Sequence, residues 1–178
     1  IEQLGYNYRL SDLNCSLGIS QIQNINKILK KRKKIAKEYF KKLEYLSDFI
    51  YLPDKTFLNI SSWHLFIIKF KFDFLKNKNL KNNIFNFFNK NGIYPQYHYI
   101  PIYNFKIYKK KKFKLENSED YYRRAISLPI YYKMTNKELN QVISCVEKII
   151  KKYKDLWNIK LRIKTVTNII MLSKNKKN

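Results

Sequence analysis

The segment SSWHLFIIKFKF, Ser61 to Phe72, lies in the first half of the chain. It is rich in aromatic and β-branched residues, and apolar and polar residues alternate toward its end. Successive side chains of an extended strand point to opposite faces, so this alternation is typical of a strand with one buried face. The segment is therefore predicted to form a β-strand.

The residues before this strand have a different period, which is typical of an amphipathic helix. From Leu13 to Leu46, apolar residues recur three, four or seven to eight positions apart. Ser11 is a plausible N-cap, and Asp12 would favour the positive end of the helix dipole. Gly18 and the polar stretch Gln23–Asn26 predict a bend or break. The pattern fits one long helix or two successive helices.

Shorter elements are predicted after the strand. Leu80–Ile93 reads as a short helix that buries Ile84, Phe87 and Phe88 and is closed by Gly92, since glycine readily adopts the left-handed conformation found after helices. The other predicted elements are an extended piece at Tyr94–Tyr103, a capped short helix at Asn117–Ala125, an extended piece at Ile126–Tyr131 and a final helix at Thr135–Tyr153. Thr135 and Glu138 have the spacing of a capping box at the start of that helix.

This order of helices and short strands predicts a small α+β domain. The 178 residues suffice for one ordinary domain. We expect this domain to span residues 1–152, followed by a basic C-terminal tail at 153–178 to which the sequence assigns no role.

The chain is strongly basic, with 37 Lys and Arg against 13 acidic residues and a net charge of +24. Runs such as KKRKK (Lys30–Lys34) and YKKKKFK (Tyr108–Lys114) could neutralise phosphates, which raises the possibility of nucleic-acid binding. However, only five of the 37 are Arg, whereas base recognition and bidentate phosphate contacts favour Arg. Abundant Lys, Asn, Ile, Phe and Tyr also suggest AT-rich coding. We therefore favour a solvated lysine surface, with nucleic acid an unlikely partner.

Two cysteines, Cys15 and Cys145, form no close pair of the kind found in zinc sites or disulfide-dense scaffolds. This favours a reducing compartment, and hence the cytoplasm. The sequence contains no signal peptide and no apolar run of about 18 residues, so no membrane association is expected. The first residue is Ile rather than Met, which leads us to expect that the chain begins inside a longer protein.

No self-contained active site is visible in the sequence. It has no Gly-rich phosphate loop, HExxH motif, Cys/His metal cluster or G-x-S-x-G motif. His64 and His98 are the only histidines, and each taken alone is more often structural than catalytic. We expect no catalytic residue and no metal site within this chain.

Five segments, taken in order, carry a resemblance to a known family. They are LGYNYRLSDLNCSLGISQI (4–22), KKRKKIAKEYF (30–40), SSWHLFII (61–68), NGIYPQYHYIPIY (91–103) and YYRRAISLPIYYKMTNKE (121–138). Together they closely resemble the C-terminal part of the DegT/DnrJ/EryC1/StrS sugar aminotransferases, over about residues 4–152. The resemblance implies the C-terminal small domain of a fold-type I aminotransferase: a long helix or helix pair, a small sheet and further helices.

The resemblance also implies an activity. Members of this family are homodimers that use pyridoxal 5'-phosphate (PLP) and take the amino group from glutamate. Within the family, this chain is most similar to enzymes that act on a UDP-4-keto-6-deoxy sugar in pseudaminic acid biosynthesis. The expected partners are therefore a second subunit, glutamate and a UDP-sugar.

Site residues follow from the matching motifs. In the family, the loop that matches GYNYR reaches into the active site of the other subunit, where its Asn meets the cofactor phosphate, so Asn7 is the expected cofactor-binding residue. An amide NH2 can donate to a phosphate oxygen without adding charge. Arg9 is a candidate second contact, to the phosphate of the nucleotide sugar or to the dimer partner. The structural alternative is that Asn7 caps a turn and Arg9 pairs with an acid.

The segment QYHYIP matches the family's substrate-binding segment, which makes Tyr97, His98, Tyr99 and Ile100 the expected substrate-binding residues. Aromatic faces can pack against uracil or sugar, and an imidazole can bond a hydroxyl or phosphate. His64 is expected to fix the strand near the site.

The Schiff-base lysine, the carboxylate beside the pyridinium nitrogen and the cofactor-cradling domain lie, in the family, N-terminal to the segment where this chain begins. The chain alone is therefore expected to be inactive. A second hypothesis from a different class is a non-catalytic basic binding module that kept the fold and contacts nucleic acid or an acidic partner.

Overall fold

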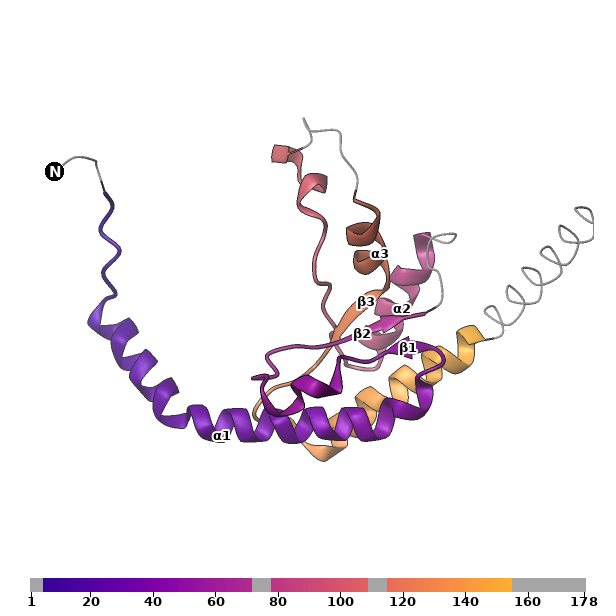
Figure 1. The fold of residues 1–178 in the computed structure, drawn as a ribbon, viewed down its shortest axis with the longest axis horizontal. Helices are drawn as coiled ribbons and strands as arrows, with labels where there is room; N and C mark the ends of the chain where they lie inside the picture. Colours follow the sequence, from indigo (N-terminus) through magenta and orange to yellow (C-terminus); the bar gives the residue numbers. More distant parts are fainter. Residues whose placement is uncertain (1–4, 72–77, 109–114, 155–178) are drawn as a thin grey trace, which may run out of the picture.

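Helix α1 (Asp12–Leu43) precedes the sheet and is the longest element of the structure (Figure 1). The computed structural model describes residues 5–71, 78–108 and 115–154. The helix begins as predicted: the Ser11 hydroxyl oxygen accepts a hydrogen bond from the backbone N–H of Asn14 at 3.3 Å, and Asp12 lies in the first turn.

Of the two predicted alternatives, one long helix is correct. Gly18 and the polar stretch after it remain inside α1, which curves along its length but does not break (Figure 1). A lone glycine costs a helix only about 1 kcal/mol relative to alanine, which is too little to end a helix of 32 residues.

Three short strands form an antiparallel sheet in the order β1-β2-β3: β1 (Ile50–Tyr51), β2 (Phe66–Phe70) and β3 (Ala125–Leu128). The register pairs Ile50 with Phe70 and Phe66 with Leu128. The central strand β2 is thus paired on one side with β1, which precedes it in the chain, and on the other with β3, which is distant in the sequence. The α+β fold class is confirmed.

The strand predicted at Ser61–Phe72 is present but shorter. Phe72 lies outside the described residues, and Trp63 has a φ of 49°, in the left-handed region that interrupts an extended chain. The Trp63 indole N–H donates to the Leu58 carbonyl at 3.1 Å, and its backbone N–H donates to the Ser61 hydroxyl at 3.0 Å. These local hydrogen bonds hold a turn just before β2.

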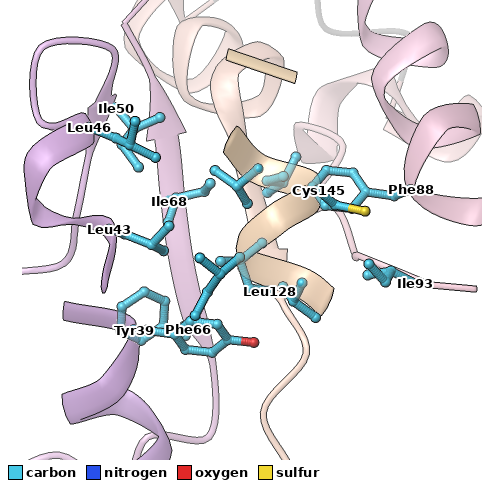
Figure 2. Close-up of a cluster of buried hydrophobic side chains, with 14 of the residues drawn as sticks. Tyr39, Leu43, Leu46, Ile50, Phe66, Ile68, Phe88, Ile93, Leu128 and Cys145 are labelled. Carbon is cyan, nitrogen blue, oxygen red and sulfur yellow. The ribbon is translucent and has the colours of Figure 1, made fainter. Parts of the chain in front are cut away.

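The hydrophobic core lies between the sheet and the helices (Figure 2). Along β2, Phe66, Ile68 and Phe70 are buried while the residues between them are only half-buried, so the predicted alternation is confirmed. The ring of Phe66 packs 4.8 Å from that of Tyr39 on α1, centroid to centroid. The side chains labelled in Figure 2 are Tyr39, Leu43, Leu46, Ile50, Phe66, Ile68, Phe88, Ile93, Leu128 and Cys145.

The short helix predicted at Leu80–Ile93 is α2 (Lys78–Lys90). It ends as predicted, because Gly92 adopts a φ of 70° and the backbone N–H of Ile93 donates to the Phe88 carbonyl at 3.0 Å. Ile84 and Phe88 are buried, whereas Phe87 is only partly buried. After α2 the chain is extended as predicted, and Gln96 pairs with Ser127 to continue the sheet beyond β3.

Short 3-10 helices connect the larger elements: η1 (Glu44–Leu46), η2 (Lys55–Asn59), η4 (Ile102–Asn104) and η5 (Lys106–Tyr108). The extended piece predicted at Tyr94–Tyr103 therefore stops at Pro101, where η4 begins.

Helix α3 (Glu116–Arg124) is present, but its predicted cap is wrong: the N-cap is Leu115, without a side-chain hydrogen bond of its own. Asn117 lies inside the helix. The hydroxyl of Tyr103, distant in sequence, accepts from the Leu115 N–H at 3.3 Å and lies 3.0 Å from the Glu119 carboxylate. A tertiary contact thus takes the place of the expected local cap.

The final helix is described over residues 136–154, and its capping box is confirmed. The Thr135 hydroxyl accepts from the Glu138 N–H at 3.2 Å, and the Glu138 carboxylate accepts from the Thr135 N–H at 2.7 Å. This helix lies alongside α1, to which Lys42 links it by donating to Asn140 at 2.7 Å (Figure 1). The boundary expected at residue 152 falls inside this helix, and the tail from residue 155 lies outside the described residues.

Within the described ranges, none of the helices combines the length and the apolar character that crossing a bilayer requires.

Candidate functional site

The residues expected to meet the cofactor lie in the extended segment Gly5–Arg9, before α1. This segment is exposed and leads away from the sheet at the free end of the helix (Figure 1). Its two tyrosine rings, Tyr6 and Tyr8, are 84% exposed and lie 5.9 Å apart.

The side-chain amide of Asn7 forms a hydrogen bond through its oxygen atom. Its Oδ1 accepts a hydrogen bond from the backbone N–H of Arg9 at 3.2 Å, so the turn considered as the structural alternative is present. The bond also fixes which end of the amide faces the backbone, because only the oxygen can accept. Among the described residues, the NH2 group forms no hydrogen bond and remains available as a donor. Within the described part of the chain, Arg9 forms no ion pair.

The second group of expected site residues, Tyr97–Ile100, lies between α2 and η4. Tyr99 is 72% exposed and Ile100 is also exposed, so both present surface to solvent. The peptide bond between His98 and Tyr99 is cis.

Tyr97 differs from its neighbours because both faces of its ring are in contact within this chain. The ring of Phe85 stacks on one face, with the centroids 3.7 Å apart and the planes at 21°. The Lys81 ammonium lies 3.8 Å from the Tyr97 centroid and must occupy the other face. The ring is therefore not free to stack on a base or sugar.

His98 is 6% exposed, and within the described residues neither ring nitrogen has a hydrogen-bond partner. Burial, together with the nearby His64, lowers the pKa of His98. A neutral imidazole has one donor and one acceptor, and buried polar atoms are normally paired. His98 is therefore able to accept one hydrogen bond and donate another to a group outside the described residues.

A pocket of about 430 Å³ lies beside this region and was missed in the sequence. Its walls come from α1, the residues before β2, the Gln96–Ser127 pair and the start of the final helix. The polar residues among its lining are Arg32, His64, Tyr94, Gln96, Ser127, Tyr131, Glu138 and Gln141. Arg32 is one of only five arginines and stands within a lysine run, the only signal that could have singled it out. Its Nε is buried and has no partner among the described residues.

The two groups of expected site residues do not meet. Gly5–Arg9 lies at the free end of α1, whereas Tyr97–Ile100 follows α2 and is adjacent to the sheet (Figure 1). Among the described side chains, no three His, Cys, Asp or Glu residues gather as metal ligands would. Each group can therefore contribute only part of a site, by hydrogen bonding and by exposed aromatic and apolar surface.

The sequence of the chain is similar to several curated proteins. It is 36% identical over 154 residues to the UDP-4-amino-4,6-dideoxy-N-acetyl-beta-L-altrosamine transaminase of Campylobacter jejuni, covering 85% of this chain and 40% of that protein. The enzyme of the same name from Helicobacter pylori is 30% identical over 160 residues, covering 86% and 40%. The chain thus spans about two fifths of the length of the curated relatives it matches.

The fold of the chain is also similar to that of solved structures. Helicobacter pylori PseC, an aminotransferase involved in the biosynthesis of pseudoaminic acid, matches with a TM-score of 0.73 and 27% identity, over 85% of this chain and 40% of that chain. Spr1654 of Streptococcus pneumoniae, solved in a PLP-form, matches with a TM-score of 0.74 and 24% identity, over 85% and 38%. The fold is that of the C-terminal small domain of PLP-dependent sugar aminotransferases.

The match to the family as a whole extends over residues 1–147, most of the chain. It includes the segment of Asn7 and the segment of His98, and it reaches into the final helix. The chain belongs to the DegT/DnrJ/EryC1/StrS aminotransferase family.

Proposed function

We propose that this chain is the C-terminal portion of a PLP-dependent nucleotide-sugar aminotransferase, which moves an amino group from glutamate to a UDP-4-keto-6-deoxy sugar in pseudaminic acid biosynthesis. The carrying observation is the 36% identity to a UDP-4-amino-4,6-dideoxy-N-acetyl-beta-L-altrosamine transaminase across 85% of this chain. The match covers only 40% of that relative, in keeping with a portion rather than a whole enzyme.

The segment Gly5–Arg9 fits a role toward the cofactor phosphate. The Asn7 amide NH2 is a neutral donor that forms no hydrogen bond among the described residues, and Arg9 offers a planar cation two residues later. When bound, PLP supplies the electron sink that lets an amino group pass between glutamate and the sugar. The PLP-form of the fold neighbour Spr1654 supports the choice of cofactor.

The segment Tyr97–Ile100 fits a role toward the UDP-sugar, with the work divided among its residues. His98 offers an unpartnered acceptor and donor, and Tyr99 and Ile100 offer exposed aromatic and apolar surface. Tyr97 contributes through its hydroxyl and its fixed position, because both ring faces are already covered.

We further propose that the enzyme is a homodimer in which Asn7 acts in the active site of the other subunit. Asn7 lies at the far end of α1 from the core of its own domain, which is where a group that serves another subunit would lie (Figure 1). A second copy would bring the two halves of the site together.

Mixed dimers of the complete protein test this arrangement. One subunit lacks the cofactor-holding lysine of the preceding domain but keeps Asn7, and the other keeps that lysine but carries Asn7→Ala. Each variant alone is impaired, whereas a mixed dimer regains one site with both groups. Random mixing makes about half the dimers mixed, so about a quarter of the wild-type sites return.

Amino transfer to the UDP-sugar is measured after the two variants are unfolded together and refolded. A matched control carries Asn82→Ala in place of Asn7→Ala. Asn82 is an exposed asparagine on α2, so this variant should be active by itself. Activity that stays at the level of the separate variants, although mixed dimers form, would show that Asn7 does not work across the dimer. A wild-type protein that transfers no amino group to any UDP-4-keto sugar would refute the proposed function itself.

A further inference from the structure

One lysine of α2 has surroundings unlike those of an ordinary surface lysine. The Lys81 ammonium lies 3.8 Å from the ring centroid of Tyr97 and 3.5 Å from that of Tyr122, and it donates a hydrogen bond to the Tyr122 carbonyl oxygen. Lys81 thus joins three parts of the chain: α2, the segment after α2, and α3.

Lys81 and Phe85 both contact the ring of Tyr97. They are four residues apart on α2 and therefore lie on one face of the helix. Phe85 stacks on one face of the Tyr97 ring and Lys81 covers the other. The Tyr97 ring is held between two side chains of a single helix, so its position follows that of α2.

The surroundings of the ammonium indicate a structural rather than a chemical role. Lys81 is half-buried, and burial lowers the pKa of its amine to about 8. Within the described residues no carboxylate lies within ion-pair distance of it, so the two ring faces and the Tyr122 carbonyl are what compensate its charge. With two rings and a carbonyl around it, Nζ has little room for a reacting carbon.

The contacts that hold Tyr97 also affect the position of the residues that follow it. His98, Tyr99 and Ile100 follow it directly. His98 is buried and its ring lies 4.6 Å from the Tyr99 ring, centroid to centroid, whereas Tyr99 and Ile100 are exposed. Gln96, just before Tyr97, is fixed by its backbone pairing with Ser127. The held ring of Tyr97 therefore lies directly before buried His98, and the two residues together connect the exposed Tyr99 and Ile100 to the rest of the domain.

We propose that Lys81 is a positioning residue, which holds Tyr97 against Phe85 and Tyr122 and thereby fixes Tyr99 and Ile100 for binding the nucleotide sugar. This inference rests on the proposed function for its substrate, while the holding of Tyr97 stands on the geometry of this chain.

The first arm of the test measures the segment itself. Backbone amide spectra of the 178-residue chain are compared for wild type, Lys81→Met, Lys81→Arg and Lys90→Met. The first removes the cation and keeps an unbranched apolar stem, the second keeps a cation that can stack on rings, and the third removes an exposed lysine of the same helix. In Lys81→Met we expect the amides of residues 97–100 to shift and to exchange with solvent about tenfold faster, while the other two variants match wild type.

The second arm uses the complete protein and measures amino transfer against the concentration of the UDP-4-keto sugar. We expect Lys81→Met to raise KM about tenfold with kcat within about threefold of wild type, because the segment binds substrate and does not react. Lys81→Arg should restore KM, which a merely structural loss of the lysine would not predict.

The outcomes separate the two claims. Unchanged amides at residues 97–100 in Lys81→Met would overturn the positioning role. Shifted amides with an unchanged KM would overturn the link from that segment to the substrate. A wild-type protein without amino transfer would refute the proposed function, while the amide comparison would still decide whether Lys81 holds Tyr97.

Discussion

At the scale of single residues, Lys81 should differ from the other lysines in its titration. Burial lowers its pKa to about 8 from an ordinary value of 10.5, and the adjacent Tyr97 and Tyr122 have raised pKa values and stay neutral in this range. In a chain labelled with ¹³C-lysine, we expect one Cε resonance to titrate near pH 8, well before the bulk of the lysines. The resonance is assigned by its loss in Lys81→Arg.

The lowered pKa of Lys81 also predicts in which direction the free energy of unfolding changes with pH. Between pH 8 and 10 the unfolded chain keeps the Lys81 proton that the folded chain has lost, so the free energy of unfolding rises with pH. Lys81→Arg should lack this rise because a guanidinium stays charged. Parallel stability curves for wild type and Lys81→Arg from pH 7 to 10, or a Lys81 resonance that titrates with the bulk, would contradict the assignment.

Residue-scale features were predictable where the cause is local. Ser11, Gly92 and the Thr135–Glu138 pair act within four residues of their own position, and each was confirmed. The cap of α3 was not predictable, because Tyr103 supplies it from another element. The covered faces of Tyr97 were hidden for the same reason, since Lys81 and Phe85 lie more than ten residues earlier.

At the scale of elements, the capping box of the final helix can be tested directly. Thr135→Ala removes the hydroxyl that accepts from the Glu138 N–H, and we expect a loss of about 1 kcal/mol in the free energy of unfolding. Thr135→Ser keeps the hydroxyl and should lose much less. Urea denaturation measures both variants, and equal losses would show that the methyl group rather than the hydroxyl matters.

Helix α1 should show a gradient of sensitivity along its length. Leu17, in its first half, is 59% exposed, whereas Leu43, at its end, is fully buried. In this chain alone, Leu17→Gln should change the free energy of unfolding by no more than about 0.5 kcal/mol. Leu43→Ala should lower it by about 2 to 5 kcal/mol. Guanidinium denaturation followed by circular dichroism compares them, and a large loss for Leu17→Gln would show that this half packs within the chain.

The difference in burial between the two halves of α1 could not be predicted from the periodicity of the sequence. The apolar stripe from Leu13 to Leu46 correctly predicted a helix, but buried residues of α1 begin only at Ile35. Periodicity shows that a helix has an apolar face and does not show what covers it. The first half of α1 presents its stripe without a partner among the described residues, so its covering could not be read from the pattern.

At the scale of the whole molecule, the net charge of +24 predicts how the chain meets polyanions. Six lysines of α1, together with Tyr132, line one surface groove: Lys27, Lys30, Lys31, Lys33, Lys34 and Lys37. Any DNA binding should be independent of sequence, and contact with about six phosphates would weaken it about a thousandfold between roughly 50 and 200 mM salt. Fluorescence anisotropy with two unrelated DNA duplexes measures this. Tight, sequence-selective binding at high salt would favour the basic-module hypothesis.

The architecture as a whole was predictable to the level of its class. The succession of helices and short strands indicated an α+β domain, but the sheet places β2 between β1 and β3, and β3 lies more than fifty residues away in the sequence. Strand order depends on such distant pairings, which no local pattern encodes. The ordered motifs around Asn7 and His98 indicated the family, while the separation of these two groups of predicted site residues became visible only in the structure (Figure 1).

The number of residues in α1 sets both the distance of the preceding segment from the core and the direction in which that segment points. Between Asp12 and Ile35, the first core residue, about 35 Å of helix carries Gly5–Arg9 out from the domain. Inserting one residue in this span would leave the core intact yet advance Asn7 by about 1.5 Å and rotate it by about 100°. Inserting seven would displace it by about 10 Å and nearly restore its angular phase. Under the proposed role of Asn7 in the partner's site, the number of residues between Asn7 and the core is therefore constrained, whereas the composition of the exposed helix surface is not.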